Sequence, residues 1–240
     1  MPSTESYICC PTDKPAAKCP YDPTGDDFYV VGPYKSKAGV VVVSDIFGMQ
    51  PNSKRFADML AENGYLVVMP DFFGKRVWPV ENWPVDPESQ KWKDHIVWSR
   101  NMDNFKPRMD RAVEMLRQMG CAKVGAVGMC WGAVLPFILS GEGTIDAAAT
   151  AHPAFFNASD VQLAKTGVLV LGGVDDGPLM EVGKAVKAHP IEPKVFRSFE
   201  NIEHGFFGSR YDPDNYTEVQ MKEALEARHL LLDFLQTTLH

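Results

Sequence analysis

The sequence predicts an α/β fold in which a mostly parallel, doubly wound sheet carries helices on both faces. Two observations lead to this fold class. Short β-branched runs alternate with longer segments whose apolar residues recur at helical spacing, and the strand-like runs are apolar throughout. Strands of that kind are buried on both faces, as in a parallel sheet covered by helices, and their reactive groups collect at the carboxyl ends of the strands.

The predicted elements follow one another without a visible linker, so we expect a single domain over residues 28–240. Residues 1–27 are rich in Pro, Cys, Asp and Thr without an apolar period, and we interpret them as an irregular lead-in. The predicted strands cover residues 39–44, 65–69, 123–128, 145–151, 167–172 and 194–199. The predicted helices cover residues 52–64, 105–120, 133–140, 179–188 and 219–239.

Particular residues set several of these boundaries. The first helix presents Phe56, Met59 and Leu60 at helical spacing and closes on an Asn-Gly pair. The strand that follows it stops at Pro70, because proline cannot donate to a sheet. The helix over residues 105–120 is amphipathic, with Met109, Val113 and Leu116 on one face.

Composition excludes several function classes. The chain has 240 residues, of which 45% are hydrophobic, enough for one full-sized core. It has 24 Lys and Arg against 31 Asp and Glu, a net charge of −7, and no basic run, so we expect no nucleic-acid or anionic-membrane partner. The longest mostly apolar stretch, residues 124–139, is shorter than the roughly 20 residues of a membrane span. The five cysteines, an odd number, and the missing export signal indicate a cytoplasmic protein. A monomer and a homodimer both stay open.

A turn that carries a thiol is the most informative local pattern. Residues 128–132 read Gly-Met-Cys-Trp-Gly between a predicted strand and a predicted helix, which is the nucleophile-elbow pattern with sulfur in place of a hydroxyl. The glycines flank a sharp bend where side chains would clash, and Cys130 at the apex would point outward. The helix N-terminus would favour its thiolate, and the Trp131 N–H would face an oxyanion. The alternative is a small buried cysteine on a glycine-rich turn.

A thiol nucleophile needs a base and an orienting acid, and both follow in the order nucleophile, acid, base that this kind of sheet uses. Asp175 and Asp176 come directly after the strand over residues 167–172, and His204 lies in the loop after the last strand. His152, which follows the strand over residues 145–151, is a competing histidine at the same sheet edge. Three strand ends thus supply thiol, carboxylate and imidazole.

Two other classes lack their motifs. Gly125, Gly128 and Gly132 are not spaced as G-x-G-x-x-G and no P-loop is present, which argues against a nucleotide-binding oxidoreductase. Cys9, Cys10 and Cys19 form no C-x-x-C pair and lie far from the histidines in sequence, so we expect neither a redox dithiol nor a zinc site.

Four separated segments give the chain a family resemblance. They are residues 40–48 (VVVVSDIFG), 63–74 (NGYLVVMPDFFG) and 125–133 (GAVGMCWGA), and the pair Gly-Gly-Val-Asp at 172–175 with His-Gly-Phe at 204–206. In these segments the sequence resembles the dienelactone hydrolase family of α/β-hydrolases, particularly its carboxymethylenebutenolidase-like branch. The resemblance spans nearly the whole chain from about residue 38 and implies an α/β-hydrolase fold.

The resemblance also implies roles for individual residues. The family's Cys, His, Asp triad maps onto Cys130, His204 and Asp175, with Asp176 as the second choice for the carboxylate. The family's acid that pairs with the resting thiol maps onto Asp45, one methylene shorter than the glutamate of the bacterial type. The alternative for Asp45 is a cap of a helix or turn. The Ile46 N–H matches the second oxyanion donor, beside that of Trp131.

The substrate pocket is expected to contain Phe47, Phe206 and Arg210, under a cap formed by residues 77–98 with its four tryptophans. The family's type enzyme has a carboxylate-binding arginine where this chain has Gly208, so dienelactone itself does not follow from the resemblance. The sequence therefore predicts a cysteine-dependent hydrolase of small lactones or activated esters that forms a thioester, without a metal or organic cofactor. The alternative is a non-catalytic member of the fold that binds small ligands.

Overall fold

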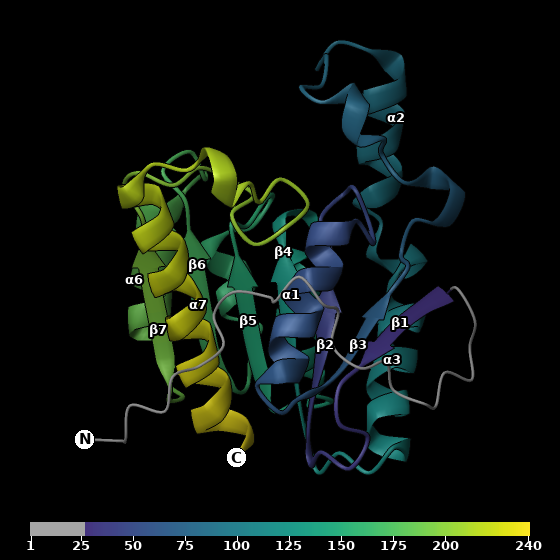
Figure 1. The fold of residues 1–240 in the computed structure, drawn as a ribbon, viewed down its shortest axis with the longest axis vertical. Helices are drawn as coiled ribbons and strands as arrows, with labels where there is room; N and C mark the ends of the chain where they lie inside the picture. The colour runs from purple at the N-terminus through teal and green to yellow at the C-terminus, as the bar shows by residue number, and fades with distance from the viewer. Residues whose placement is uncertain (1–26) are drawn as a thin grey trace.

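A seven-stranded sheet organises the chain in the computed structural model, which describes residues 27–240 (Figure 1). The strands are β1 (Phe28–Val31), β2 (Ala38–Val43), β3 (Leu66–Pro70), β4 (Lys123–Met129), β5 (Ala147–Ala151), β6 (Gly167–Gly172) and β7 (Lys194–Ser198). They lie in the order β1-β3-β2-β4-β5-β6-β7, with β1 antiparallel to β3 and the remaining pairs parallel. The predicted mostly parallel sheet is confirmed.

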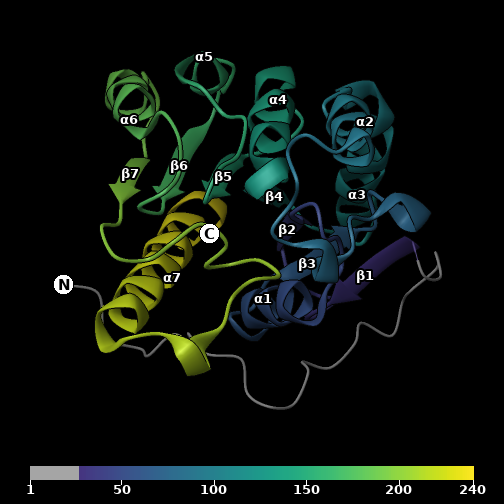
Figure 2. The ribbon, with the colours of Figure 1, turned by 90° about the horizontal axis from the view of Figure 1, so that it is seen from above.

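Helices cover both faces of this sheet, as Figure 2 shows from above. One face carries α1 (Pro51–Glu62) and α7 (Glu218–Leu239). The other carries α3 (Lys106–Gln118), α4 (Leu135–Glu142), α5 (Ala158–Val161) and α6 (Leu179–Ala188). The doubly wound arrangement expected from the apolar strands is therefore present.

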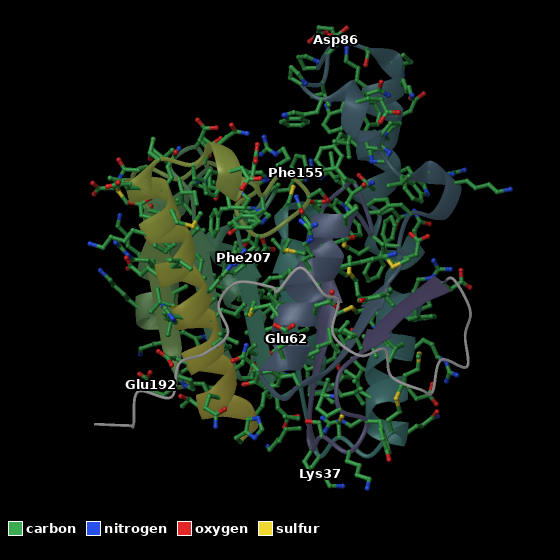
Figure 3. The ribbon with its side chains drawn as sticks, in the orientation of Figure 1. Lys37, Glu62, Asp86, Phe155, Glu192 and Phe207 are labelled. Atoms are coloured by element: carbon green, nitrogen blue, oxygen red, sulfur yellow. The ribbon has the colours of Figure 1, made fainter. Side chains whose placement is uncertain are left out.

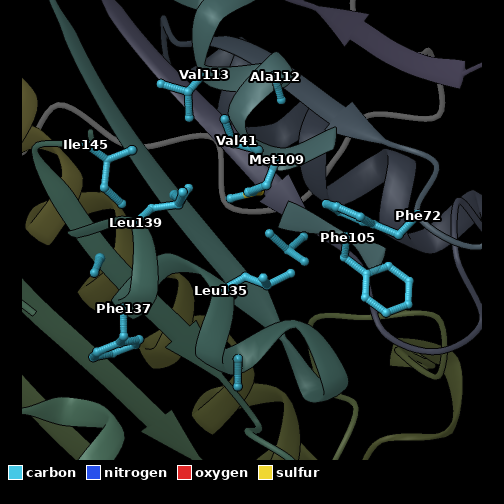
Figure 4. Close-up of a cluster of buried hydrophobic side chains, with 14 of the residues drawn as sticks. Val41, Phe72, Phe105, Met109, Ala112, Val113, Leu135, Phe137, Leu139 and Ile145 are labelled. Carbon is cyan, nitrogen blue, oxygen red and sulfur yellow. The ribbon is translucent and has the colours of Figure 1, made fainter. Parts of the chain in front are cut away.

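Strand β2 shows why the strands are apolar throughout. Successive strand residues point to opposite faces, so Val41 packs in the core layer under α3 and α4 while Val40 packs in the layer under α1 and α7. Both layers are closed by helices, and all six residues of β2 are buried. Figure 4 shows Val41 beside Met109 of α3 and near Leu135 of α4.

Most predicted elements are present, but some bounds differ and some elements were not predicted. The bounds of β6 and α6 are those expected. The antiparallel edge strand β1, the helix α2 (Gln90–Ser99) and the one-turn helix α5 were not predicted. Strand β3 includes Pro70, at which it was expected to stop. The helix expected over residues 133–140 starts later, because Pro136 has no N–H and is tolerated only in the first turn; residues 130–134 form a 3-10 helix, η5, ahead of α4.

Residues between β3 and α3 project beyond the sheet (Figure 1). They contain the 3-10 helices η2 (Gly74–Arg76), η3 (Val80–Asn82) and η4 (Met102–Asn104) and the helix α2 (Gln90–Ser99). Figure 3 shows Asp86 at the outer tip of this segment and Lys37 at the opposite end of the molecule. This projection contains the residues expected to form a cap.

Two predictions from the sequence concern the N-terminal lead-in and a membrane span. The predicted lead-in, with Cys9, Cys10 and Cys19, lies outside residues 27–240 apart from Asp27. Within residues 27–240, no helix combines the length and apolar character needed to cross a bilayer.

Candidate active site

Cys130 occupies the apex of a strained turn at the end of β4. Its φ of 53° lies in the left-handed region, which costs a non-glycine residue free energy and is typical of functional turns. A Cβ at Gly128 would lie 2.1 Å from the Gly132 carbonyl oxygen, and one at Gly132 would lie 2.5 Å from Val43 Cγ1. Both glycines are therefore required by close backbone approach, as the elbow pattern predicts.

The Cys130 thiol and the His204 imidazole are brought together. The Cys130 side chain forms a hydrogen bond with His204, although the two residues lie at the ends of β4 and beyond β7. Cys130 is 9% exposed, so the residue is largely shielded from water. The expected juxtaposition of thiol and imidazole is present.

The carboxylate that holds His204 is Asp176, whereas the sequence analysis assigned this position to Asp175. Asp176 Oδ1 lies 2.5 Å from His204 Nδ1, and its Oδ2 accepts a hydrogen bond from the Gly173 N–H at 2.6 Å. The Asp176 side chain is 1% exposed, which favours a strong charge-assisted contact. Asp175 is exposed and accepts from the His204 backbone N–H at 2.5 Å, so it holds the main chain and does not contact the imidazole ring.

The electrostatic balance at His204 favours the imidazolium. Burial alone would lower its pKa, but the negative charge of Cys130 and the contact with Asp176 outweigh that effect and raise the pKa to about 10. The hydrogen bond between His204 and Cys130 acts in the same direction. The arrangement therefore favours an imidazolium at His204, oriented by a buried carboxylate.

His152, the competing histidine, lies beside His204 without joining the carboxylate. Its ring meets the His204 ring edge to face, with centroids 4.9 Å apart. It is fully buried, and neither ring nitrogen has a hydrogen-bond partner among residues 27–240. Burial, together with the positive charges of His204 and Arg210, lowers its pKa well below the usual value, so the ring is neutral.

Two backbone N–H groups were expected to bind an oxyanion beside the thiol. Ile46 lies in the turn after β2, and within residues 27–240 its N–H makes no hydrogen bond. Trp131 is the second residue of η5, where an N–H has no partner inside the helix. The Trp131 ring is fixed by a 2.7 Å hydrogen bond from Nε1 to the Ser99 carbonyl and by contacts with Phe73 and Phe105.

Asp45 makes different contacts from those the sequence analysis expected. The residue is 3% exposed, and its carboxylate accepts hydrogen bonds from the Ser209 N–H, the Ser209 hydroxyl and the Phe47 N–H. Within the described chain these donors, not the Cys130 thiol, are its hydrogen-bond partners. Burial raises its pKa, and the three hydrogen bonds and the charge of His204 oppose that rise.

The three expected pocket residues differ in placement. Arg210 donates to the His204 carbonyl at 2.7 Å and lies over the Trp83 ring of the projecting segment, 4.6 Å from its centroid. Phe47 meets the same ring edge-on at 5.9 Å. Phe206 was wrongly expected in the pocket: it is fully buried in the core against Phe199 and Phe207, so a ligand has no access to it.

Sequence reasoning missed Trp83 and Ser209 as parts of this region. Trp83 was recognised only as one of four tryptophans in the cap, and nothing in its spacing indicates that it reaches Arg210. Ser209 lies in the loop after His204, but its partner Asp45 is 164 residues away. Within residues 27–240, no group of three or more His, Cys, Asp or Glu side chains converges as a metal site would require.

Comparisons with known proteins identify the family of this chain. The profile of the dienelactone hydrolase family matches residues 27–239. The carboxymethylenebutenolidase homolog of Mus musculus is 32% identical over 213 residues, which cover 85% of this chain and 83% of that protein. The homolog of Homo sapiens is 29% identical over 184 residues, 72% of each chain.

Solved structures share the fold. The dienelactone hydrolase of Anabaena variabilis superposes with a TM-score of 0.61 at 15% identity, covering 89% of this chain and 92% of that one. A monoglyceride lipase variant of Saccharomyces cerevisiae has the same TM-score at 11% identity, covering 98% of this chain and 99% of that one. These likenesses identify the α/β-hydrolase fold. The chain therefore belongs to the dienelactone hydrolase family and is a hydrolase that acts on ester or lactone bonds.

Proposed function

We propose that the chain hydrolyses lactones or activated carboxylic esters of small molecules with Cys130 as nucleophile, through a thioester acyl-enzyme. One observation carries this proposal: a thiol on a strained elbow is hydrogen-bonded to an imidazole whose Nδ1 lies 2.5 Å from a buried carboxylate. That is the chain of contacts that activates a nucleophile and orients its base.

In the acylation half, the Cys130 sulfur attacks the carbonyl carbon and the carbonyl oxygen becomes an oxyanion. The N–H groups of Ile46 and Trp131 are the donors we assign to that charge. Collapse of the adduct breaks the carbon–oxygen bond, and the His204 imidazolium gives its proton to the leaving oxygen. The product of this half is a thioester on Cys130.

In the deacylation half, the now neutral His204 takes a proton from water as the water oxygen attacks the thioester carbon. The carbon–sulfur bond breaks, the acid product leaves, and the thiolate–imidazolium pair is restored. Asp176 keeps Nδ1 of the ring protonated, so that the other nitrogen faces the reaction in both halves.

The nucleophile selects among esters. A thiolate is a better leaving group than an alkoxide, so an adduct with a simple alkyl ester returns to substrate more often than it proceeds. Enol lactones and aryl esters release a stabilised oxyanion and avoid that return. With Gly208 where the type enzyme has an arginine, Arg210, next to the His204 carbonyl, is the cation we assign to an acidic substrate group.

The test is ester hydrolysis combined with alkylation. We expect the chain to hydrolyse p-nitrophenyl acetate, iodoacetamide to abolish this activity, and peptide mass spectrometry to place the adduct on Cys130. Cys121 is the matched control, because burial raises the pKa of its thiol to about 11 and it reacts slowly. Cys121→Ala should keep the activity and Cys130→Ala should lose it.

Two results would contradict the proposal in different ways. Persistent turnover by a folded Cys130→Ala variant would place the nucleophile elsewhere. A wild-type chain that turns over no member of a panel of lactones and aryl esters would favour the non-catalytic, ligand-binding alternative.

A further inference from the structure

The contacts of Asp45 join two segments that lie far apart in the sequence. Its Oδ1 accepts from the Phe47 N–H at 3.0 Å, within the turn that contains Ile46. Its Oδ1 and Oδ2 also accept from the Ser209 hydroxyl at 2.8 Å and the Ser209 N–H at 2.7 Å. One carboxylate thus connects the turn after β2 with the loop after His204.

Three donors directed at one buried group require a carboxylate. An aspartate accepts at both oxygens, whereas an asparagine would turn an NH₂ donor toward another donor and leave a buried N–H unpaired. Asp45 is 3% exposed, so water does not replace a lost bond. An N–H left unpaired in this position therefore weakens the contact between the two segments.

Gly208 is what allows this approach. A Cβ at Gly208 would lie 2.4 Å from Asp45 Oδ2 and 3.4 Å from His152 Cε1. No side chain fits there without moving the carboxylate. Gly208, which stands where the family has an arginine, therefore has a structural reason in this chain. Asp45 is shorter than glutamate, and only a glycine at position 208 lets the backbone of residues 208–209 come close enough to contact it.

Both joined segments carry parts of the proposed chemistry. The turn over residues 45–48 carries the Ile46 N–H, and its Ile46 carbonyl accepts from the Trp78 N–H at 3.1 Å. The loop over residues 205–211 carries Arg210, which donates to the His204 carbonyl, and it is tied to α1 through Asn52 and Ser53. Because one segment carries the Ile46 N–H and the other contacts His204, holding the two segments together also holds the oxyanion donor and the base at a fixed distance.

We propose that Asp45 is a positioning residue that clamps the turn containing Ile46 to the loop after His204. Its partner in this clamp is Ser209, and Gly208 leaves the space that the carboxylate occupies. It acts through the backbone and not by contact with the thiol. This inference rests on the proposed function for its kinetic consequences. It differs from the thiol-pairing role that the family resemblance implies for this position.

Two variants disturb the clamp from opposite sides. Asp45→Asn removes the charge and an acceptor, whereas Gly208→Ala keeps the charge and displaces the carboxylate. We expect each to lower kcat for p-nitrophenyl acetate by roughly 10- to 100-fold, below the 10²- to 10³-fold effect of deleting an oxyanion donor outright. KM should change by less than about threefold, since substrate contacts are kept.

The pH profile of Cys130 alkylation by iodoacetamide separates positioning from thiol pairing. If the clamp is correct, the profile of Gly208→Ala coincides with that of the wild type while its kcat falls. If Asp45 instead tunes the thiol, Asp45→Asn shifts the profile and Gly208→Ala leaves kcat near the wild-type value, which would overturn the proposal. The double variant should be no slower than the slower single variant, because both break the same contact.

A readout independent of activity completes the test. Hydrogen exchange of the peptide covering residues 45–48 should accelerate in Gly208→Ala and in Ser209→Ala, although both changes are remote in sequence. Asp146→Asn is the control, since Asp146 binds the amino end of β4, away from Cys130. It should lower the melting temperature without affecting kcat or this peptide. Unchanged exchange in both loop variants would refute the clamp even if no ester were hydrolysed.

Discussion

The atom of His204 that each aspartate contacts determines which of the two is the acid of the proposed Cys130–His204 site. Asp175 and Asp176 are adjacent and both contact His204, but one holds the backbone N–H and the other the ring nitrogen. Their burial differs accordingly: the Asp176 side chain is 1% exposed and Asp175 is on the surface. A buried carboxylate at the ring can stabilise an imidazolium, whereas an exposed one beside the main chain is screened by water.

The Asp pair gives a direct test at the residue scale. Asp176→Asn leaves Nδ1 of His204 without an ionised partner, and we expect kcat/KM for p-nitrophenyl acetate to fall by roughly two to four orders of magnitude. Asp175→Asn keeps an amide oxygen for the His204 N–H, and we expect a loss of less than about tenfold. Steady-state kinetics of the two variants, made side by side, measure both values. The reverse order would return the acid role to Asp175.

At the scale of one element, the β4–η5 turn is built around two glycines. The Cβ of any other residue at position 128 would meet the carbonyl oxygen of Gly132, which is backbone and cannot rotate away. The same strand carries Gly125, where a Cβ would face the side chains of Leu239, Ala147 and Leu235 at 3.1 Å or more. The two positions therefore differ in what must move, although both are buried glycines of one strand.

We expect Gly128→Ala to open the elbow and Gly125→Ala to leave it intact. Displacing the turn changes the direction of the Cys130 side chain, so Gly128→Ala should lower both the melting temperature and the rate of Cys130 alkylation, the latter by at least about tenfold. Gly125→Ala should alkylate at the wild-type rate, whatever its small effect on stability. Differential scanning fluorimetry and the alkylation assay decide the matter. Equal alkylation rates in both variants would show that the turn does not aim the thiol.

The elements also show where sequence reasoning reaches and where it stops. Periodicity and turn residues predict β6 and α6 with their observed bounds, because burial on both faces and helical spacing are local signals. The choice between Asp175 and Asp176 depends on the shape of one turn, which periodicity does not encode. The Asp45–Ser209 contact joins residues 164 positions apart, and the core position of Phe206 depends on packing. No local pattern determines either one.

In the molecule as a whole, both faces of the sheet are covered by apolar core layers, so the polar groups gather at the carboxyl ends of the strands. Cys130, His152, Asp176 and His204 all follow strands at that edge, and the projecting segment reaches it through Trp83. Packing them together buries His152 completely, with no hydrogen bond to either ring nitrogen among residues 27–240. A group of this kind makes the stability of the whole fold depend on pH.

The sign of that dependence follows from the depressed pKa of His152. Its folded-state pKa lies well below the usual 6.5, so below pH 6.5 the unfolded chain binds a proton that the folded chain does not. Its contribution to stability is complete above pH 6.5 and falls as the solution is acidified, by at most about 1.4 kcal/mol per pH unit.

His152→Phe keeps a ring against His204 but removes the titration. As the pH falls from 6.5 to about 5, the wild type should therefore lose stability that the variant keeps. We expect the melting temperature of the variant minus that of the wild type to increase by roughly 2–5 °C for each pH unit of acidification. A constant packing cost of the larger ring shifts the whole curve without altering this slope. Melting curves that run parallel over the interval would show that His152 is not kept neutral by the fold.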